Sequence, residues 1–290
     1  MRVGVGQMRE TIWILAILAV FALLAAVFSA VFSAVAQPAK PPTLEEILQR
    51  LQKNLDQYDS DVPSFFCDEH SVSRLVPDLH DRETVTDSVF RLKRVLNRDH
   101  TTTLEESREV KTVNGRPAKS QEIDGPSLLQ GAFEGSLAVV SISQQACMNY
   151  TLERTKRNDP KAPIIVHFAS VLTPENAAGC LLHEDGKGRV LIDPATMQIS
   201  RMELTIPHHT IIPGGAYDSP IKGEWVLSVD YAPVVLKGET FWMPAMIASR
   251  ATGSPGTFHA TEWSFTATYR NYHKLEVTSR IVPQGDAPAP

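Results

Sequence analysis

Alternating apolar and polar residues, separated by turn sequences, dominate this chain from Ser64 onward. In the clearest example, Trp263, Phe265 and Tyr269 alternate with polar residues, which is the pattern of a strand with one buried face. Asn114-Gly115 is a strong signal for a tight hairpin turn. We expect about nine or ten antiparallel strands in a meander, without the β-α-β units of a nucleotide-binding fold. The predicted strands are 64–75, 83–96, 102–113, 147–155, 163–171, 189–192, 197–206, 225–231, 240–251 and 262–269.

Three segments do not fit this simple pattern. Residues 102–113 are polar on both predicted faces, which is typical of an exposed or edge strand. Residues 125–146 are apolar and rich in glycine, and we expect a short helix or a lid-like insertion there. Residues 205–223 are expected to form a long loop, since His208-His209 and several Pro and Gly residues interrupt the alternation.

One amphipathic helix precedes the strands. Thr43 and Glu46 form the sequence pattern of a capping box, in which each side chain bonds the backbone amide near the other. Apolar residues then recur at helical spacing up to Tyr58, before the turn cluster 59–63. A sheet of this size twists and curls, so the helix is expected to pack on its concave side. The predicted fold is therefore mainly β (α+β), a half-barrel formed by one domain over residues 43–282, followed by a disordered tail at 283–290.

The first 36 residues have the features of an export signal or a membrane anchor. Arg2 and Arg9 precede an uncharged apolar run that ends in Ala34-Val35-Ala36. A basic start and an A-x-A site are typical of a cleaved signal, although the run is also long enough to span a bilayer. The arginines keep the N-terminus cytoplasmic in both cases. We therefore expect the domain, after a proline-rich spacer at 37–42, to be periplasmic or secreted, or anchored to the inner membrane if the leader is retained.

The cysteines fit an oxidising compartment. Three cysteines follow the leader, so at least one is free or pairs between chains. If strands 147–155 and 163–171 form a hairpin, Cys180 comes within loop reach of Cys147. We predict a Cys147–Cys180 disulfide, and neither a C-x-x-C motif nor an activating partner points to a catalytic thiol.

Composition and motifs argue against several functions. A formal net charge of −5 without a basic cluster argues against nucleic acid as a partner, and Arg154-Thr155-Lys156-Arg157 is interpreted as a solvated turn. Ser219-Pro220-Ile221-Lys222 matches S-x-x-K only formally, because Pro220 and Gly223 bracket a loop. His208-His209, His183-Glu184-Asp185 and the pair His259 and Glu262 lack a metal-ligand arrangement and are interpreted as solvated polar residues. No cofactor, metal or catalytic residue is predicted.

The sequence resembles one known family. The helix TLEEILQRLQKNLDQY, the Phe pair in Ser64-Phe65-Phe66 and the series of strands are similar to the lipoprotein-carrier superfamily, which includes the carrier LolA and the envelope-stress regulator RseB. GRVLIDPATMQISRMEL and VDYAPVVLKGETFWMP resemble secreted relatives common in Acidobacteria. The resemblance covers about residues 43–282, and it implies a concave sheet face that binds acyl chains. It assigns no individual ligand contact.

Four aromatic residues on the C-terminal strands are the candidates for such a contact: Trp225, Trp242, Trp263 and Phe265. They either form core packing under the helix or line an apolar groove. The leading hypothesis is a non-catalytic envelope protein that holds a lipid, an acyl chain or another apolar small molecule, or a lipidated protein. The alternative is a protein–protein interaction or stress-sensor module that uses strand 102–113 and segment 205–223. A hydrolase has no support beyond the predicted export.

Overall fold

The computed structural model describes residues 41–76, 82–96, 98, 102–118, 137–153, 159, 161–211, 221–253 and 261–275. The chain divides into two compact units, residues 1–42 and Thr43–Pro290, and nearly all described residues belong to the second. The predicted leader, the Arg154–Arg157 turn and the C-terminal tail lie outside the described residues. No helix among the described residues is long and apolar enough to cross a membrane.

Eleven strands and one long helix form the described part of the chain. All strands belong to one antiparallel sheet, as predicted, and the sheet is open. The elements are α2 (Leu44–Asp61), β1 (Phe65–Val76), β2 (Arg82–Leu96), β3 (Thr102–Val113), β4 (Arg116–Pro117), β5 (Met148–Leu152), β6 (Ile164–Ser170), β7 (Lys187–Ile192), β8 (Ile199–Ile211), β9 (Ile221–Leu236), β10 (Glu239–Gly253) and β11 (Thr261–Lys274), with short 3-10 helices η1 (Ile142–Gln144) and η2 (Ala177–Gly179).

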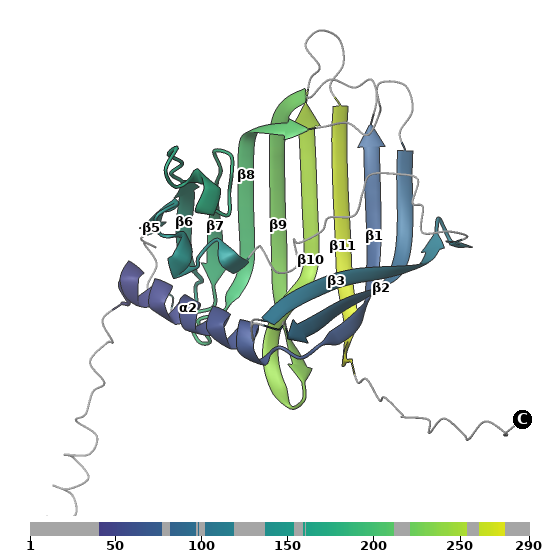
Figure 1. Ribbon diagram of the computed structural model, residues 1–290, viewed down its shortest axis with the longest axis horizontal. Coiled ribbons are helices and arrows are strands. Elements are labelled where there is room, and N and C mark those ends of the chain that lie inside the picture. The colour runs from purple at the N-terminus through teal and green to yellow at the C-terminus, as the bar shows by residue number, and fades with distance from the viewer. Residues whose placement is uncertain are drawn as a thin grey trace, which may run out of the picture. The chain divides into compact units, whose positions relative to one another are not determined.

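The strand order is not a simple meander. The sheet runs β4-β3-β2-β1-β11-β10-β9-β8-β7-β6-β5, so two meanders are joined where β1 pairs with β11. The connection from β4 to β5 therefore links the two opposite edges of the sheet (Figure 1). As a result, the N-terminal hairpin of β1 and β2 lies beside the C-terminal strand.

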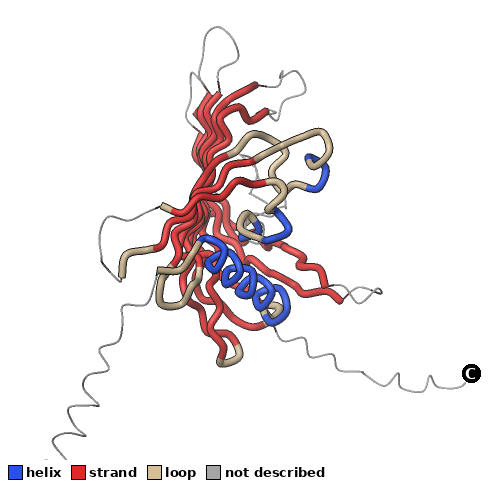
Figure 2. The backbone as a smooth tube through the Cα atoms, turned by 90° about the vertical axis from the view of Figure 1, so that its left-hand side faces the viewer, coloured by secondary structure: helices blue, strands red, loops and turns tan. Residues whose placement is uncertain are grey.

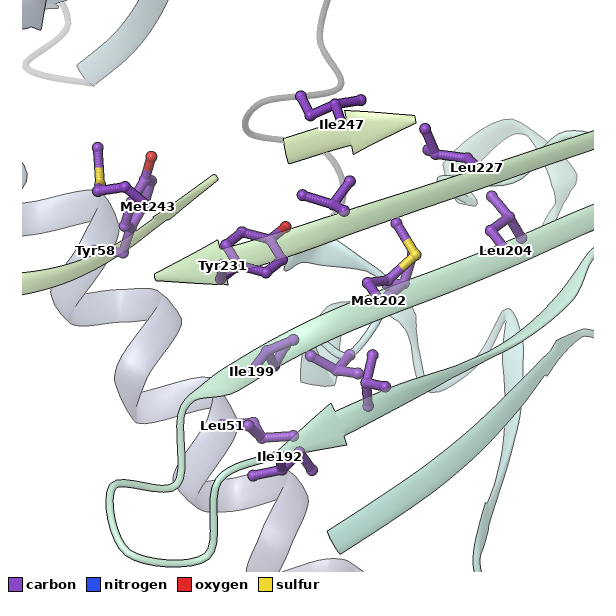
Figure 3. Packing of buried hydrophobic residues seen from close by; sticks show 14 of the residues in the cluster. Leu51, Tyr58, Ile192, Ile199, Met202, Leu204, Leu227, Tyr231, Met243 and Ile247 are labelled. Atoms are coloured by element: carbon purple, nitrogen blue, oxygen red, sulfur yellow. The ribbon is translucent and has the colours of Figure 1, made fainter. Parts of the chain in front are cut away.

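The sheet is curved, and α2 lies on its concave side (Figure 2). Leu51 of the helix lies beside Ile192, and Tyr58 lies beside Met243, at one end of the sheet (Figure 3). All four side chains are buried. The helix therefore covers the end of the concave face where β7 and β8 meet, as the amphipathic pattern predicted.

Local sequence fixes both ends of the helix. Thr43 caps it, since the Thr43 hydroxyl accepts from the Glu46 amide and the Glu46 carboxylate accepts from the Thr43 amide at 2.7 Å. At the other end, the Arg94 side chain donates to the backbone oxygens of Val62 and Tyr58. A cationic side chain near a helix C-terminus satisfies orphan carbonyls and complements the helix dipole.

The predicted hairpin turns are present. Asn114 and Gly115 have φ values of 50° and 70°, the positive pair that a type I′ turn requires. Lys237 and Gly238 have φ values of 56° and 82° and join β9 to β10. Gly suits such positions because it has no Cβ.

The long loop predicted at 205–223 is wrong in part. β8 continues to Ile211 and β9 begins at Ile221, and only 212–220 lie outside the described residues. A register shift between Ile206 and His209 accommodates Pro207, which cannot donate a ladder hydrogen bond. His208 and His209 therefore belong to a strand and not to a loop.

The disulfide prediction is confirmed. Cys147 and Cys180 are bonded, with 5.5 Å between their Cα atoms, because the β5–β6 hairpin brings the start of β5 next to the segment that follows β6. Cys67 is free and buried. Of the segment 125–146, the part from Leu137 onward is described, and it contains a single turn of helix and η1.

Candidate functional site

The concave face of the sheet is defined here by the side chains that point to the same side as α2. Its apolar part comes from β6 to β11, where large apolar side chains lie opposite one another on most strands. Leu204 on β8 is opposite Leu227 on β9, and the small buried Ser249 on β10 lies between Leu227 and Phe265 on β11. Leu204 and Leu227 extend the apolar surface beyond the end covered by α2 (Figure 3).

Three of the four predicted aromatic residues come together on this face. Trp225 and Trp263 are both cross-strand neighbours of Ala251, one on each side, and the Trp263 and Phe265 rings are stacked with centroids 6.4 Å apart. Phe265 is fully buried, whereas Trp225 and Trp263 are partly buried against the core. The small Ala251 between the two indoles leaves them room to lie over the sheet.

Trp242 does not join this group. It lines a small groove between α2 and the end of β10, together with Leu51, Leu55 and Phe241. The groove has a volume of about 40 Å³, far below the roughly 300–1,000 Å³ of small-molecule sites. Trp242 therefore packs beside the helix.

Sequence reasoning missed a buried ionic cluster on the concave face. The Arg108 guanidinium donates from Nε to both carboxylate oxygens of Glu69, at 3.0 and 2.9 Å, and the Tyr269 hydroxyl donates to Glu69 at 2.8 Å. The side chains of Arg108 and Glu69 are 9% and 0% exposed. Arg108 also lies over the Phe90 ring, 4.8 Å from its centroid. Strand β3, predicted to be polar on both faces, thus turns two charged side chains inward, Arg108 and Glu106, which are 9% and 11% exposed.

Burial and charge set the ionisation of this cluster. Burial, the largest single effect, lowers the pKa of Arg108, but the charge and hydrogen-bond interactions with Glu69 and Tyr269 together outweigh it and leave that pKa above its ordinary value. Burial raises the pKa of Tyr269, so the phenol stays protonated and can donate to Glu69. The carboxylate of Glu106 lies 3.9 Å from the Arg108 guanidinium, which leaves one more carboxylate than cation in the neighbourhood.

A patch of hydroxyl side chains lies next to this cluster. It covers the concave face of β1 and β2, where the register places Ser71 opposite Thr86, Ser73 opposite Thr84, and Ser88 opposite Glu69. All of these hydroxyl residues are buried. We call Ser71, Ser73, Thr84, Thr86 and Ser88 the hydroxyl patch.

A second polar cluster lies at the edge of the aromatic group. Glu184, from the loop before β7, accepts a hydrogen bond from His209 and another from the Thr210 amide at 3.1 Å. The His209 ring lies 5.3 Å from Trp225, whose indole N–H donates to Ser249 at 2.6 Å. Sequence reasoning interpreted His209 and Glu184 as solvated, whereas each is partly buried.

The opposite face carries a polar hollow of about 500 Å³ over β5 to β8. Ala169 and Gly188 form part of its lining, and the surrounding side chains are polar or charged, among them His167, Lys187 and Arg189. Arg189 is paired with Glu203 at 2.6 Å, and His167 with Glu153 at 2.8 Å. This is the composition expected of a solvated sheet face.

The part of the chain that the structure describes contains neither a metal-binding cluster nor a reactive thiol. That part contains no group of three or more His, Cys, Asp or Glu residues that could hold a metal ion. Burial raises the pKa of the Cys67 thiol, which keeps it protonated and a poor nucleophile. His183 bonds the Ala177 carbonyl at 3.2 Å, while Ser219 and His259 lie outside the described residues.

Comparison with known proteins finds a similarity of fold. No family model matches the sequence, and no curated protein is similar to it. Among solved structures, a LolA superfamily protein from Nitrosomonas europaea matches with 8% identity and a TM-score of 0.32 over 80% of this chain and 94% of that one. A putative outer membrane lipoprotein-sorting protein domain from Vibrio parahaemolyticus matches with 10% identity and a TM-score of 0.34, over 79% and 92%. A DUF1329 family protein from Desulfovibrio piger matches with 10% identity and a TM-score of 0.37, over 80% and 93%.

The chain has the arrangement that its sequence predicted, with an open, curled antiparallel sheet and an N-terminal helix on the concave side. With identities of 8–10% and TM-scores of 0.32–0.37, the matched structures carry no argument about the function of this chain. A ligand for this chain has to be argued from its own residues.

Proposed function

We propose that this protein is an exported, non-catalytic envelope protein that binds the acyl chain of a lipid, or of a lipidated protein, on the concave face of its sheet. The observation that carries the proposal is the apolar surface of β8 to β11, which continues beyond the part covered by α2. A curved sheet with one apolar face is a common way to hold an apolar ligand.

The dimensions of this surface suit an acyl chain. From Ile199 beside the helix to Ile206 near Trp225, β8 advances by about 23 Å at roughly 3.3 Å per residue. One leaflet of a bilayer, half of a hydrocarbon core of about 30 Å, is about 15 Å thick. An extended acyl chain of this length is therefore shorter than the row of apolar β8 side chains, which are themselves buried, and the partly buried Trp225 and Trp263 lie at the end away from the helix.

The predicted leader and the disulfide support an envelope location. The apolar run between Ile12 and Ala36 favours export or anchoring, and Cys147–Cys180 is the kind of bond that persists in oxidising compartments. We therefore place the domain in the periplasm or outside the cell, tethered to the inner membrane if the leader is kept.

Native mass spectrometry tests the proposal on protein purified from its own envelope. A bound mass that disappears on organic extraction, and that returns with added lipid, is the expected result. Protein that carries no lipid, and whose tryptophan fluorescence does not respond to any lipid with an acyl chain, would refute acyl-chain binding.

A second function is favoured by β3. On the side away from β2, only Thr112 and Val113 of this strand pair with another strand, β4, among the described residues. A strand with a free edge can accept an extended segment of a partner protein. Crosslinking from a photoreactive residue at Ser107 in membrane fractions would capture such a partner, and a carrier without one would give no crosslink to protein.

A further inference from the structure

The concave face is divided into an apolar and a hydroxyl part, and the division is unusual for a buried surface. The hydroxyl patch on β1 and β2 is as buried as the apolar residues of β8 to β11. On the same two strands, Val72, Val85 and Val89 occupy alternate positions and therefore lie on the opposite, outer face. The apolar residues of these strand segments thus face outward, while the hydroxyl residues face the interior.

Packing alone does not account for this arrangement. Burial of an apolar side chain stabilises a fold by roughly 25 cal/mol per Å², so a sheet face that served only as core would carry the valines. A buried hydroxyl costs free energy unless it has a hydrogen-bond partner. Some partners are within the protein, since the Ser71 and Thr86 hydroxyls bond each other.

Ser88 has no such partner. It is buried, and its hydroxyl oxygen makes no hydrogen bond in the described structure. The register places Ser88 between Glu69 on β1 and Val110 on β3, so its side chain points to the concave face. Ser88 thus lies at the end of the hydroxyl patch that adjoins Glu69, and its unpartnered hydroxyl is free to bond a group that comes from outside the chain.

The charges beside the patch determine what that group can be. Arg108 is already paired with Glu69, and Glu106 adds a second carboxylate 3.9 Å from the guanidinium. No free cation is therefore available in this described cluster for an anionic head group, and a carboxylate or phosphate here would be desolvated without a counter-ion. Ester, amide and alcohol groups carry no such cost. Ester oxygens accept from Ser and Thr hydroxyls, while alcohols and amides can both donate to and accept from them.

We propose that the ligand is an uncharged amphipathic lipid, with its hydroxyl or ester head group on the hydroxyl patch and its acyl chain on the apolar surface of β8 to β11. This inference rests on the proposed acyl-chain binding and adds the chemical class of the head group. Ser88 recognises the head group, and Phe265, which is the cross-strand neighbour of Ser73, marks the boundary between the two parts.

The test compares two lipids that share one chain, monooleoylglycerol and oleate, by titration of the tryptophan fluorescence of the full domain. The wild-type protein is expected to bind monooleoylglycerol more tightly, by tenfold or more at neutral pH. Ser88→Ala is expected to weaken monooleoylglycerol about 2- to 12-fold, the value of one neutral hydrogen bond, and to leave oleate unchanged. Its urea midpoint should not fall, because the Ser88 hydroxyl has no partner to lose.

A control variant makes the same kind of change on the outer face. Ser264→Ala with Thr266→Val removes two hydroxyls from β11 at positions that alternate with Phe265, and should alter neither affinity. Equal affinity for the two lipids, or an unchanged monooleoylglycerol affinity in Ser88→Ala, would overturn the head-group inference while leaving acyl-chain binding intact. If neither lipid binds, the proposed acyl-chain binding and the head-group inference both fail.

Discussion

The buried pair of Arg108 and Glu69 gives the sharpest test of how this sheet is held in its curved form. Arg108 reaches from β3 across β2 to Glu69 on β1, and it packs on Phe90 on the way. Arg108→Met keeps much of the side-chain volume but removes the charge. The Glu69 carboxylate, 0% exposed, would keep the hydrogen bond from Tyr269 and lose its counter-ion.

The expected cost is large. Removal of one partner of a buried ion pair destabilises a protein by about 3–5 kcal/mol, and the lost contact with the Phe90 face adds about 0.5–2 kcal/mol. We therefore expect Arg108→Met to lower the free energy of unfolding by about 3.5–7 kcal/mol. Adding Glu69→Gln should recover part of this loss, because the double variant buries no uncompensated charge.

The assay is equilibrium urea unfolding followed by circular dichroism and tryptophan fluorescence. Arg91→Met is the matched control, because Arg91 on β2 pairs with Glu109 on β3, next to Arg108, with side chains that are 34% and 47% exposed. A pair this exposed contributes about 0–1 kcal/mol. If Arg108→Met costs no more than Arg91→Met, or if Glu69→Gln adds its own full loss, the pair does not support the fold as argued.

Three further predictions concern other parts of the domain. Leu51→Ala removes a buried side chain between α2 and the concave face and should lower the free energy of unfolding in urea by about 2–5 kcal/mol. A loss below about 1 kcal/mol would show that the helix is not packed there. Replacing Cys147 and Cys180 by serine opens a loop with a sequence separation of 33 and should cost about 3–4 kcal/mol by loop entropy, whereas an unchanged midpoint would contradict the bond. Partial burial, the largest single effect, raises the pKa of Glu184, but the hydrogen bonds from His209 and the Thr210 amide and the nearby charges of His209 and Lys222 together outweigh it and hold that pKa below its ordinary value. The ionised Glu184 therefore stabilises the fold above about pH 4.5, and this contribution is lost as pH falls through the lowered pKa. The difference in free energy of unfolding between wild type and Glu184→Gln should shrink below about pH 4. A difference that does not change with pH would contradict this prediction.

Local signals allowed much of this fold to be predicted. The capping box at Thr43, the Asn114-Gly115 turn and the bounds of β3 are set by residues close in sequence, and the structure has each of them. The Cys147–Cys180 bond followed from one hairpin, which is also a local feature. Such predictions succeed because the deciding contacts span few residues.

The misses share the opposite property. His209 was interpreted as solvated because Pro207 suggested a loop, but its partner Glu184 comes from another segment of the chain. Arg108 lies in a strand whose polar residues suggested two solvated faces. Its burial depends on the register of three strands and on Tyr269, which reaches β1 only because β1 pairs with β11.

Which residues of β1 and β2 face the concave side also depends on contacts beyond the local sequence, and it bears most directly on function. Hydropathy alone would turn Val72 and Val85 inward and the neighbouring serines and threonines outward. Phe65 and Cys67 at the start of β1, and Phe90 and Leu92 near the end of β2, face the core, and a regular strand cannot change faces without a bulge. These apolar anchors therefore hold Ser71, Ser73, Thr84, Thr86 and Ser88 on the concave side. Ser71 and Thr86 bond each other there, whereas the Ser88 hydroxyl makes no hydrogen bond in the described structure, so Ser88 is the group of this patch that a polar partner from outside the core would meet.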